Sequence, residues 1–358
     1  MIKVHINFII SVFLKAFIFV SLIVLSLVIV LNLLTEIEFF REINIKFHTP
    51  IYLSFLNSLS LIFEMFPFVF LVCTQIFFIN LLNNNQIQIF KYSGLKNSKI
   101  ITILSLFSFF IGILIITIFY NLSSNLKNVY LEIKNKYTSD DKYLAVITNN
   151  GLWIKDTVEG KTNIIHATKM NANLLIDTTI TQLNKEYDVV KHIQSEKIDI
   201  TKKNWLAHNA AIFEGNEGTK KEILKIYSNF DYEKIQGLFS NLSSLSLLEL
   251  FNLRENYLTL NYSTTEVNLQ INKIISYPIY LSLMTILSAI IMFNTKSLKS
   301  ITLKISIGLF MSVIIYYLNN FFYVMGKTEK FSVFFAVWLP MIFLFSINTI
   351  LTFKINEK

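Results

Sequence analysis

The sequence has 358 residues, of which 53% are hydrophobic and 16% charged, with only 9 Gly and 4 Pro. Its apolar residues occur in runs of about twenty, the length that an α-helix needs to cross a hydrocarbon layer. This composition excludes an ordinary soluble domain. The net charge of +8 does not indicate nucleic-acid binding, because no soluble stretch carries a Lys/Arg cluster with interleaved aromatic residues.

The positive charge is unevenly distributed. Residues 121–273 hold 18 basic and 18 acidic side chains, whereas the remainder holds 14 basic and 6 acidic ones. The excess therefore belongs to the apolar part and its short loops, where it acts as a topology signal.

In chain order, the apolar runs predict six transmembrane helices. The first run is too long for a cleavable signal peptide and has no small-residue cleavage site, so it is expected to stay as the first span. Residues 51–63 are interpreted as an interfacial segment that ends at Pro67, where the second crossing begins. The six predicted spans are residues 8–34, 66–82, 100–120, 271–293, 301–322 and 331–353.

From Asn121 the pattern changes to short alternating runs separated by Asn, Asp, Gly and Lys, which is typical of antiparallel strands. Residues 121–241 are therefore expected to form an all-β domain between the third and fourth spans. Leucines at helical spacing predict a helix over residues 246–258, within a connecting region of residues 242–270. The expected strands include residues 143–148, 151–154, 163–167, 174–179 and 205–213.

The lysines predict the orientation. With the N-terminus inside, the inner segments hold nine basic residues and the short outer loops hold four, which favours cytoplasmic N- and C-termini and an external β domain. The inner set is Lys3, Lys91, Lys96, Lys99, Lys296, Lys299, Lys304, Lys354 and Lys358, and the outer set is Arg41, Lys46, Lys327 and Lys330.

No catalytic pattern is visible. The five histidines are scattered, and Cys73 is the only cysteine, so neither a disulfide nor a cysteine-based metal site is predicted. The sequence has no phosphate-binding Gly-x-x-x-x-Gly-Lys-[Ser/Thr] loop and no Gly-x-Ser-x-Gly elbow. We expect no enzyme activity, no cofactor and no metal, and any ATP-driven work requires another subunit.

Three polar features of the apolar part carry functional interpretations. Glu64 is an acidic residue within an apolar run, but a position at the interface explains it better than a site. Residues 83–99 predict either a short cytoplasmic helix that ends at Gly94 or a plain connector. Asn319 and Asn320 either bind a polar headgroup or bond neighbouring helices.

The whole arrangement resembles the LptF/LptG permeases of lipopolysaccharide export. The resemblance rests on the order of three spans, a β domain, a connecting helix and three spans, together with short motifs. These motifs are Glu38-Phe39-Phe40-Arg41, Glu64-Met65-Phe66-Pro67, Gln86 to Gly94, Gly151-Leu152-Trp153-Ile154-Lys155-Asp156 and Ala336-Val337-Trp338-Leu339-Pro340. The Gly-Leu-Trp strand and the run at residues 245–250 look more like LptG.

The resemblance implies a polytopic inner-membrane protein with a periplasmic, jellyroll-like β domain. It implies a second six-span permease, a cytoplasmic ATPase dimer, a periplasmic bridge protein with a jellyroll domain, and lipopolysaccharide as partners. Residues 1–120 would then carry three spans and a coupling helix at about residues 83–94, and residues 271–358 the other three.

The resemblance also suggests site residues. Contacts with the ATPase are expected from Gln86, Gln88, Phe90, Lys91 and Gly94, and contacts with lipid from Asn32, Arg41, Tyr317, Asn319 and Asn320. Gln86 and Lys91 stand where the family usually has Glu and Arg, which weakens or replaces a charged contact. The span-one region offers Asn32 where the family often has a cation.

Other interpretations remain open at this point. A lipoprotein-release or macrolide-export permease would have four spans, with the domain after the first. A membrane sensor or scaffold would copurify without an ATPase. A membrane enzyme ranks last, because no acid, base or metal set is present.

Overall fold

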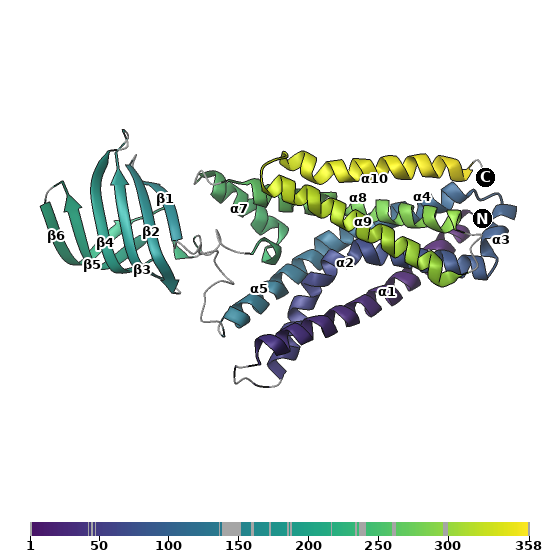
Figure 1. The fold of residues 1–358 in the computed structure, drawn as a ribbon, viewed down its shortest axis with the longest axis horizontal. Helices are drawn as coiled ribbons and strands as arrows, with labels where there is room; N and C mark the ends of the chain where they lie inside the picture. The colour runs from purple at the N-terminus through teal and green to yellow at the C-terminus, as the bar shows by residue number, and fades with distance from the viewer. Residues whose placement is uncertain are drawn as a thin grey trace. The chain divides into compact units, whose positions relative to one another are not determined.

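The computed structural model describes most of the chain. It covers residues 2–41, 43, 46, 48–135, 137, 152–158, 161–171, 173–184, 186, 188–215, 217–232, 235, 241–259, 263–295 and 300–356. The chain divides into two compact units, Met1–Lys127 with Thr265–Lys358, and Asn128–Thr264 (Figure 1). The predicted strand at residues 143–148, Gly151 and five of the topology residues, Lys3, Lys296, Lys299, Lys354 and Lys358, lie outside the described positions or side chains.

The first unit is helical and confirms the six predicted spans. Each of six helical segments is long and apolar enough to cross a membrane. The elements are α1 (Ile2–Phe39), α2 (His48–Asn83), the short α3 (Gln86–Tyr92), α4 (Asn97–Leu114) continued by the π-helix η1 (Ile115–Tyr120) and α5 (Asn121–Asn135), α8 (Thr265–Asn294), α9 (Ile301–Lys327) and α10 (Val333–Asn356).

The second span differs from the prediction. Helix α2 runs without a break from His48 through Pro67 to Asn83, so residues 51–63 are not a separate interfacial segment. A proline has no N–H and leaves the carbonyl four residues earlier without its helical donor. Here that carbonyl belongs to Phe63, and it accepts a hydrogen bond from the hydroxyl of Tyr277 in α8. The missing bond is thus replaced from another helix, and the span continues.

The third span also extends beyond its predicted end. The β region was expected from Asn121, but α5 is helical to Asn135 and the first described strand begins at Leu152. Asn and Ser lower the hydropathy of this stretch, yet Tyr130, Leu131 and Lys134 recur at helical spacing and are buried. The polar composition hid this helical pattern.

The helical unit is centred on α2 and α8. In the apolar 18-residue stretch of each of these helices, 67% and 78% of the residues are buried, against 17% in α1 and 22% in α9. At Gly112 of α4 a side-chain Cβ would lie only 2.8 Å from the backbone Cα of Pro278, so a glycine is needed for α4 to approach α8. Hydroxyl groups bond across the same helices, Ser105 with Ser282 at 2.7 Å and Thr285 with Ser108 at 2.9 Å.

The second unit contains one antiparallel sheet of six strands in the order β1-β2-β3-β4-β5-β6. The predicted strands at residues 163–167, 174–179 and 205–213, and the described part of 151–154, all lie in it. Since every described neighbour in the sheet is also a neighbour in sequence, the jellyroll-like domain is a meander over these strands. The strands are β1 (Leu152–Val158), β2 (Lys161–Asn171), β3 (Leu174–Leu183), β4 (Val189–Asp199), β5 (Asn204–Glu214) and β6 (Glu217–Tyr227).

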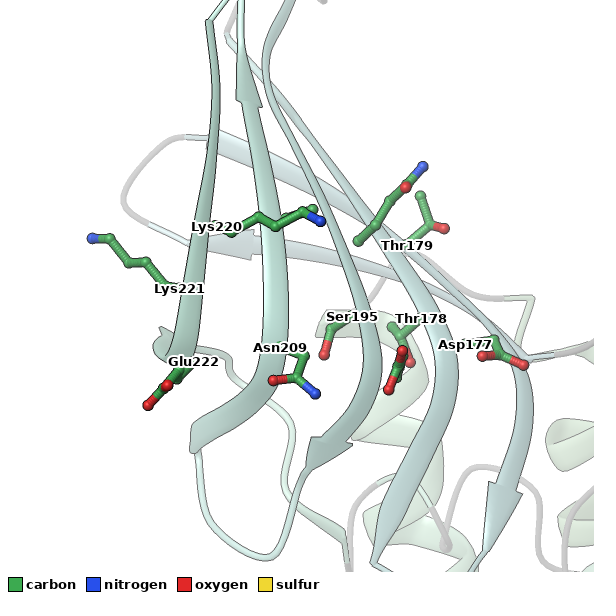
Figure 2. A pocket seen from close by; sticks show the side chains of 11 residues that line it. Asp177, Thr178, Thr179, Ser195, Asn209, Lys220, Lys221 and Glu222 are labelled. Atoms are coloured by element: carbon green, nitrogen blue, oxygen red, sulfur yellow. The ribbon is translucent and has the colours of Figure 1, made fainter.

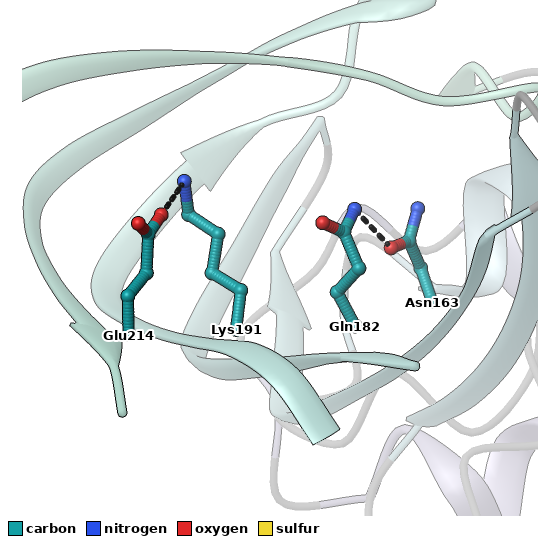
Figure 3. Close-up of polar contacts among 4 residues, drawn as sticks. All are labelled: Asn163, Gln182, Lys191 and Glu214. Atoms are coloured by element: carbon teal, nitrogen blue, oxygen red, sulfur yellow. Dashed lines mark hydrogen bonds and ion pairs between the residues drawn. The ribbon is translucent and has the colours of Figure 1, made fainter. Parts of the chain in front are cut away.

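One face of the sheet, called the inner face, carries the core. Partner residues in register place an isoleucine from each of β1 to β5 in one transverse row, and all five are buried. The row consists of Ile154, Ile165, Ile180, Ile193 and Ile212. A polar row lies beside it, in which Gln182 donates to Asn163 at 3.0 Å and Lys191 pairs with Glu214 at 2.7 Å (Figure 3).

Asp156 begins that polar row and ties the first strand to the chain that follows the last. Its carboxylate is fully buried. It accepts hydrogen bonds from the Ser228 hydroxyl at 2.7 Å, the Asn229 backbone N–H at 3.1 Å and the Asn229 side chain at 2.9 Å. The sheet is therefore rolled, because residues at its two ends meet.

The strands share a second transverse feature, a line of kinks (Figure 2). The burial alternation changes phase along β3, β4 and β5, as when Leu175 and Thr178 of β3 both face inward. Asp177 and Asn209 on this line have left-handed backbones, with φ of 48° and 51°. The kink row is defined as Thr168, Asp177, Glu196, Asn209 and Glu222, which lie opposite one another across β2 to β6.

Helix α7 (Leu247–Thr259) confirms the helix predicted over residues 246–258. Ser246 precedes it. The Glu249 carboxylate accepts from the Ser246 backbone N–H at 2.7 Å, and the Ser246 hydroxyl oxygen accepts from the Glu249 backbone N–H at 3.4 Å. This reciprocal pair is a capping box, which the Ser-Leu-Leu-Glu sequence encodes locally.

Candidate functional site

The connector between the second and third spans contains a true helix, α3, which decides between the two interpretations left open. It starts after Asn85, whose φ is 55°, and ends with Gly94 at φ 78°. The Leu95 N–H bonds the Phe90 carbonyl at 2.9 Å and the Gly94 N–H bonds the Lys91 carbonyl at 3.0 Å. These two bonds form a Schellman motif, and Gly94 occupies its C′ position as the sequence predicted.

Helix α3 has one anchored side. Ile87 and Phe90 are buried, and the Phe90 ring meets the rings of His5 and Phe8 of α1 with centroids 5.9 and 6.1 Å apart. A cavity of about 30 Å³ lies between α3 and the ends of α2 and α8. It is lined by Phe78, Leu82, Ile87, Lys91, Asn97, Met292 and Phe293. Helix α3 therefore lies against the ends of the two central helices.

The other side of α3 is exposed and partly apolar. Ile89 is 59% exposed and Tyr92 is 89% exposed, and both lie beside the polar Gln88 and Lys91. Gln86 is half-buried at the start of the helix. Of the five residues predicted to contact an ATPase, Gln88 and Lys91 share this exposed side, Phe90 anchors the helix, and Gly94 ends it.

Asn32, predicted to meet lipid, is bonded inside the protein. Its side chain donates to the Ser54 carbonyl at 3.0 Å and accepts from the Asn57 side chain at 3.1 Å. Ser54 in turn donates to the Ile29 carbonyl at 2.9 Å. The side-chain amide of Asn32 thus bonds α1 to α2. Its contact with lipid stays a prediction.

The other residues predicted to contact lipid do not form one cluster with Asn32. Arg41 is exposed in the turn after α1. On α9, Tyr317 is 65% exposed, Asn320 is exposed, and the Asn319 side chain lies near the Tyr280 hydroxyl of α8. Both interpretations of Asn319, a bond to a neighbouring helix and a contact with lipid, stay predictions.

A group of charged side chains at the end of the bundle opposite α3 was missed from the sequence. Lys127 interacts electrostatically with both Glu64 and Lys273. The Lys273 ammonium lies 5.7 Å from the centre of the Tyr323 ring, and Lys327 pairs with Glu266 at 3.2 Å. Lys127 belongs to this group only because the third helix continues past Tyr120. The sequence predicted a β domain over residues 121–241, and so Lys127 was not expected among the helices.

The described residues hold no group of three His, Cys, Asp or Glu side chains that could bind a metal ion. Their polar groups instead form two sites at opposite ends of the helical unit, the exposed side of α3 and the charged group around Lys127.

Comparison with known protein families decides the identity. The family model described as lipopolysaccharide export system permease LptF/LptG matches residues 7–354, nearly the whole chain. The chain belongs to the LptF/LptG family. No match was found among the curated proteins.

Family membership makes the chain a multi-pass transport permease of the lipopolysaccharide export system. The family match agrees with the architecture, because it extends through all six spans and the inserted sheet. It does not separate LptF from LptG, so the LptG-like features at residues 151–156 and 245–250 remain predictions.

Proposed function

We propose that this LptF/LptG permease is a transmembrane subunit of an ATP-driven exporter in the inner membrane, and that it is the LptG-like half. It pairs with a second six-span permease above a cytoplasmic ATPase dimer. ATP is hydrolysed by that dimer and not by this chain. Lipopolysaccharide taken from the membrane passes to a periplasmic bridge protein that carries a jellyroll domain.

The observation that carries this proposal is the exposed side of α3 in a chain that matches the family throughout. Ile89 and Tyr92 are large apolar groups in a short polar connector, which favours a protein contact over bulk water. The anchored side of the same helix touches α1, α2 and α8. A partner that moves α3 can therefore change the helices that enclose the lipid.

The orientation follows from the same helix. Figure 1 draws α3 and both termini at one end of the helical unit. Lys91, Lys96 and Lys99 lie at that end, and a cytoplasmic side for them agrees with the positive-inside rule. Residues 121–270, which leave and re-enter the unit at the other end, are then periplasmic.

At the periplasmic end, the group around Lys127 is the stronger candidate for lipid contact. Lys127 interacts with the Glu64 carboxylate and with Lys273, and two cations with one carboxylate leave a positive charge that a further anion can neutralise. Lipopolysaccharide carries phosphate groups that can fill this role. Arg41, Tyr317 and Asn320 are exposed and can add further contacts at the same headgroup.

The test is the coupling of ATP hydrolysis to lipid release in the reconstituted complex. Ile89→Glu should abolish lipid-stimulated ATPase activity, because it places a charge in the proposed contact, whereas Gln86→Ala should reduce it less. Ile301→Glu is a matched control on α9, where the native side chain is 43% exposed. Normal coupling in Ile89→Glu would overturn the role of α3.

A further inference from the structure

The cavity between α3 and the ends of α2 and α8 has room for one small group. Its volume is about 30 Å³. A single water molecule needs at least about 10–15 Å³, whereas sites for small-molecule ligands usually measure about 300–1,000 Å³. The cavity is therefore too small for a metabolite or a lipid chain, and its occupant must be of the size of a water molecule or of one polar side-chain end.

Two polar residues, Lys91 and Asn97, line this cavity among apolar ones. Lys91 belongs to the last turn of α3, and Asn97 is the first residue of α4. The side-chain oxygen of Asn97 is buried and has no hydrogen-bond partner among the described residues. Buried polar atoms in native proteins are normally paired, so an unpaired acceptor on a cavity wall indicates that a donor belongs in the cavity.

The ends of two helices add negative potential at the same place. Helix α2 ends at Asn83 and helix α8 at Asn294, and residues from both last turns line the cavity. The last four carbonyls of a helix have no donor within that helix, and they form the negative end of its dipole. Neither α2 nor α8 has a basic residue in its last turn. A cation from elsewhere is therefore favoured in the cavity.

The lining contains the cation that fits. The ammonium group of Lys91 carries three donors and no acceptor, and it ends a flexible stem of four carbons. It can therefore lie either on the exposed side of α3 or in the cavity. The described lining residues include no carboxylate, so a free divalent metal ion would lack its usual ligands there. The neighbouring lysines Lys96 and Lys99 are exposed and do not line the cavity.

We infer that Asn97 is a positioning residue for α3, which accepts a hydrogen bond from the Lys91 ammonium when that group enters the cavity. The contact would hold α3 against the ends of α2 and α8. Its consequence rests on the proposed function, in which Lys91 also faces the ATPase. The cavity and a bound ATPase then compete for one ammonium group, and a partner that draws Lys91 outward releases α3 from the central helices.

The test is a double-mutant cycle followed by hydrogen exchange of the full chain in lipid nanodiscs. The backbone N–H groups of Gly94 and Leu95 report the opening of α3, because they bond the carbonyls of its last turn. Asn97→Leu and Lys91→Met should each accelerate this exchange roughly tenfold, the loss of one hydrogen bond to a charged group. The double variant should exchange no faster than either single variant, because both changes remove the same contact.

Two further variants separate this contact from a general loosening of the connector. Lys96→Met, which changes an exposed lysine outside the lining, is the matched control and should exchange as wild type. Asn97→Asp keeps an acceptor and should exchange no faster than wild type, but it should not restore slow exchange to Lys91→Met. Additive effects of Asn97→Leu and Lys91→Met, or wild-type exchange in either one, would overturn the inference and leave the cavity to a water molecule.

A second measurement separates this inference from the proposed function. The exchange experiment uses the chain without partners, so its result does not depend on an ATPase. In the reconstituted complex, Asn97→Leu should keep the ATPase bound but reduce its stimulation by lipid, whereas Ile89→Glu should lose the ATPase. Non-additive exchange together with normal stimulation in Asn97→Leu would support the contact between Lys91 and Asn97 and overturn the coupling role proposed for α3.

Discussion

Different interactions stabilise the interior of the helical unit and the interior of the β unit. Between the helices, the decisive contacts are close backbone approaches such as Gly112 with Pro278, and hydroxyl bonds such as Ser288 to the Leu71 carbonyl at 2.7 Å. In the sheet, the decisive contacts are transverse rows of side chains, five isoleucines and a polar row that begins at Asp156.

The difference follows from the solvent. Lipid tails are as apolar as leucine, so apolar burial alone does not drive helices together, and close packing and internal hydrogen bonds must do so. We propose that the β unit lies in the aqueous periplasm, where burying isoleucine is favourable in itself. We therefore expect variants in one unit to leave the other unchanged, and each unit offers its own probe. Cys73, the only cysteine, is buried in α2, and Trp205 is buried in β5. The fluorescence of Trp205 is read in a chain whose other two tryptophans, Trp153 and Trp338, are replaced by Phe, because Trp338 lies in the helical unit.

Gly112→Val should have the largest effect. The new Cβ would lie 2.8 Å from the Pro278 Cα, which is backbone and cannot turn aside. Overpacking of this kind costs about 3 kcal/mol. Thiol labelling of Cys73 in detergent should accelerate, while Trp205 fluorescence stays unchanged. Gly308→Ala is the milder comparison, because its Cβ meets only the end of the Gln75 side chain.

Asp156→Ala should have the next largest effect, this time in the β unit. It removes a buried carboxylate that accepts three hydrogen bonds, and bonds to charged groups are worth about 1.5–3 kcal/mol. The temperature of the thermal transition followed by Trp205 fluorescence should fall, and the rate of Cys73 labelling should be unaffected. Glu217→Ala, an exposed residue of β6, should leave both signals unchanged. An unaltered transition in Asp156→Ala would show that the rolled sheet does not depend on this tie.

Tyr277→Phe should destabilise the helical unit by roughly 1–3 kcal/mol. The Phe63 carbonyl loses the Tyr277 hydroxyl, which donates to it in place of the N–H that Pro67 lacks. The ring stack between Phe63 and Tyr277, with centroids 4.5 Å apart, is retained. The matched control is Tyr316→Phe, where the native ring is 60% exposed. Equal Cys73 labelling rates in the two variants would contradict the assigned role of the hydroxyl.

Ile180→Val tests the middle of the isoleucine row. Loss of one buried methylene there should cost about 1 kcal/mol. Ile223→Val, at a position that is 59% exposed on β6, should cost much less. Chemical unfolding followed by Trp205 fluorescence measures both. A smaller loss in Ile180→Val than in Ile223→Val would show that the row is not the core.

The smallest effect is expected at Asp199. The Thr201 hydroxyl, 2.6 Å from the carboxylate, and the Thr201 backbone N–H hold the pKa of Asp199 below its ordinary value. A lowered folded-state pKa stabilises the fold above the ordinary pKa, and this contribution is lost as the pH falls through the folded-state pKa. Thr201→Ala should raise the pKa of Asp199, as measured by NMR titration. The stabilities of variant and wild type should differ at pH 6 and converge under strongly acidic conditions.

The fold could be predicted from sequence wherever one segment decides its own structure. Six apolar runs predicted six spans, Gly94 predicted the end of α3, and the Ser246-Glu249 pair encodes the start of α7. The prediction was wrong where a distant residue decides. The helix continues through Pro67 because the Phe63 carbonyl is bonded by Tyr277, 214 positions from Phe63 along the chain. The helix after Tyr120 was missed because Asn and Ser obscured buried positions at helical spacing.

The site was predictable to a smaller extent. The coupling segment could be located because its turn chemistry is local. Asn32 was chosen as a polar group near an interface, but only the three-dimensional contacts show that Ser54 and Asn57 bond it. The kink row was invisible from sequence, because Asp177 and Asn209 acquire meaning only when the register aligns them across the strands.

The most direct test of the export role is purification of the tagged chain from its own membranes in mild detergent, with mass spectrometry of bound protein and lipid. The account predicts a P-loop ATPase, a second six-span permease and lipopolysaccharide with the wild-type chain, and loss of the ATPase alone from Ile89→Glu. Recovery of the wild-type chain by itself, with only bulk phospholipid, would contradict it and favour a membrane sensor or scaffold.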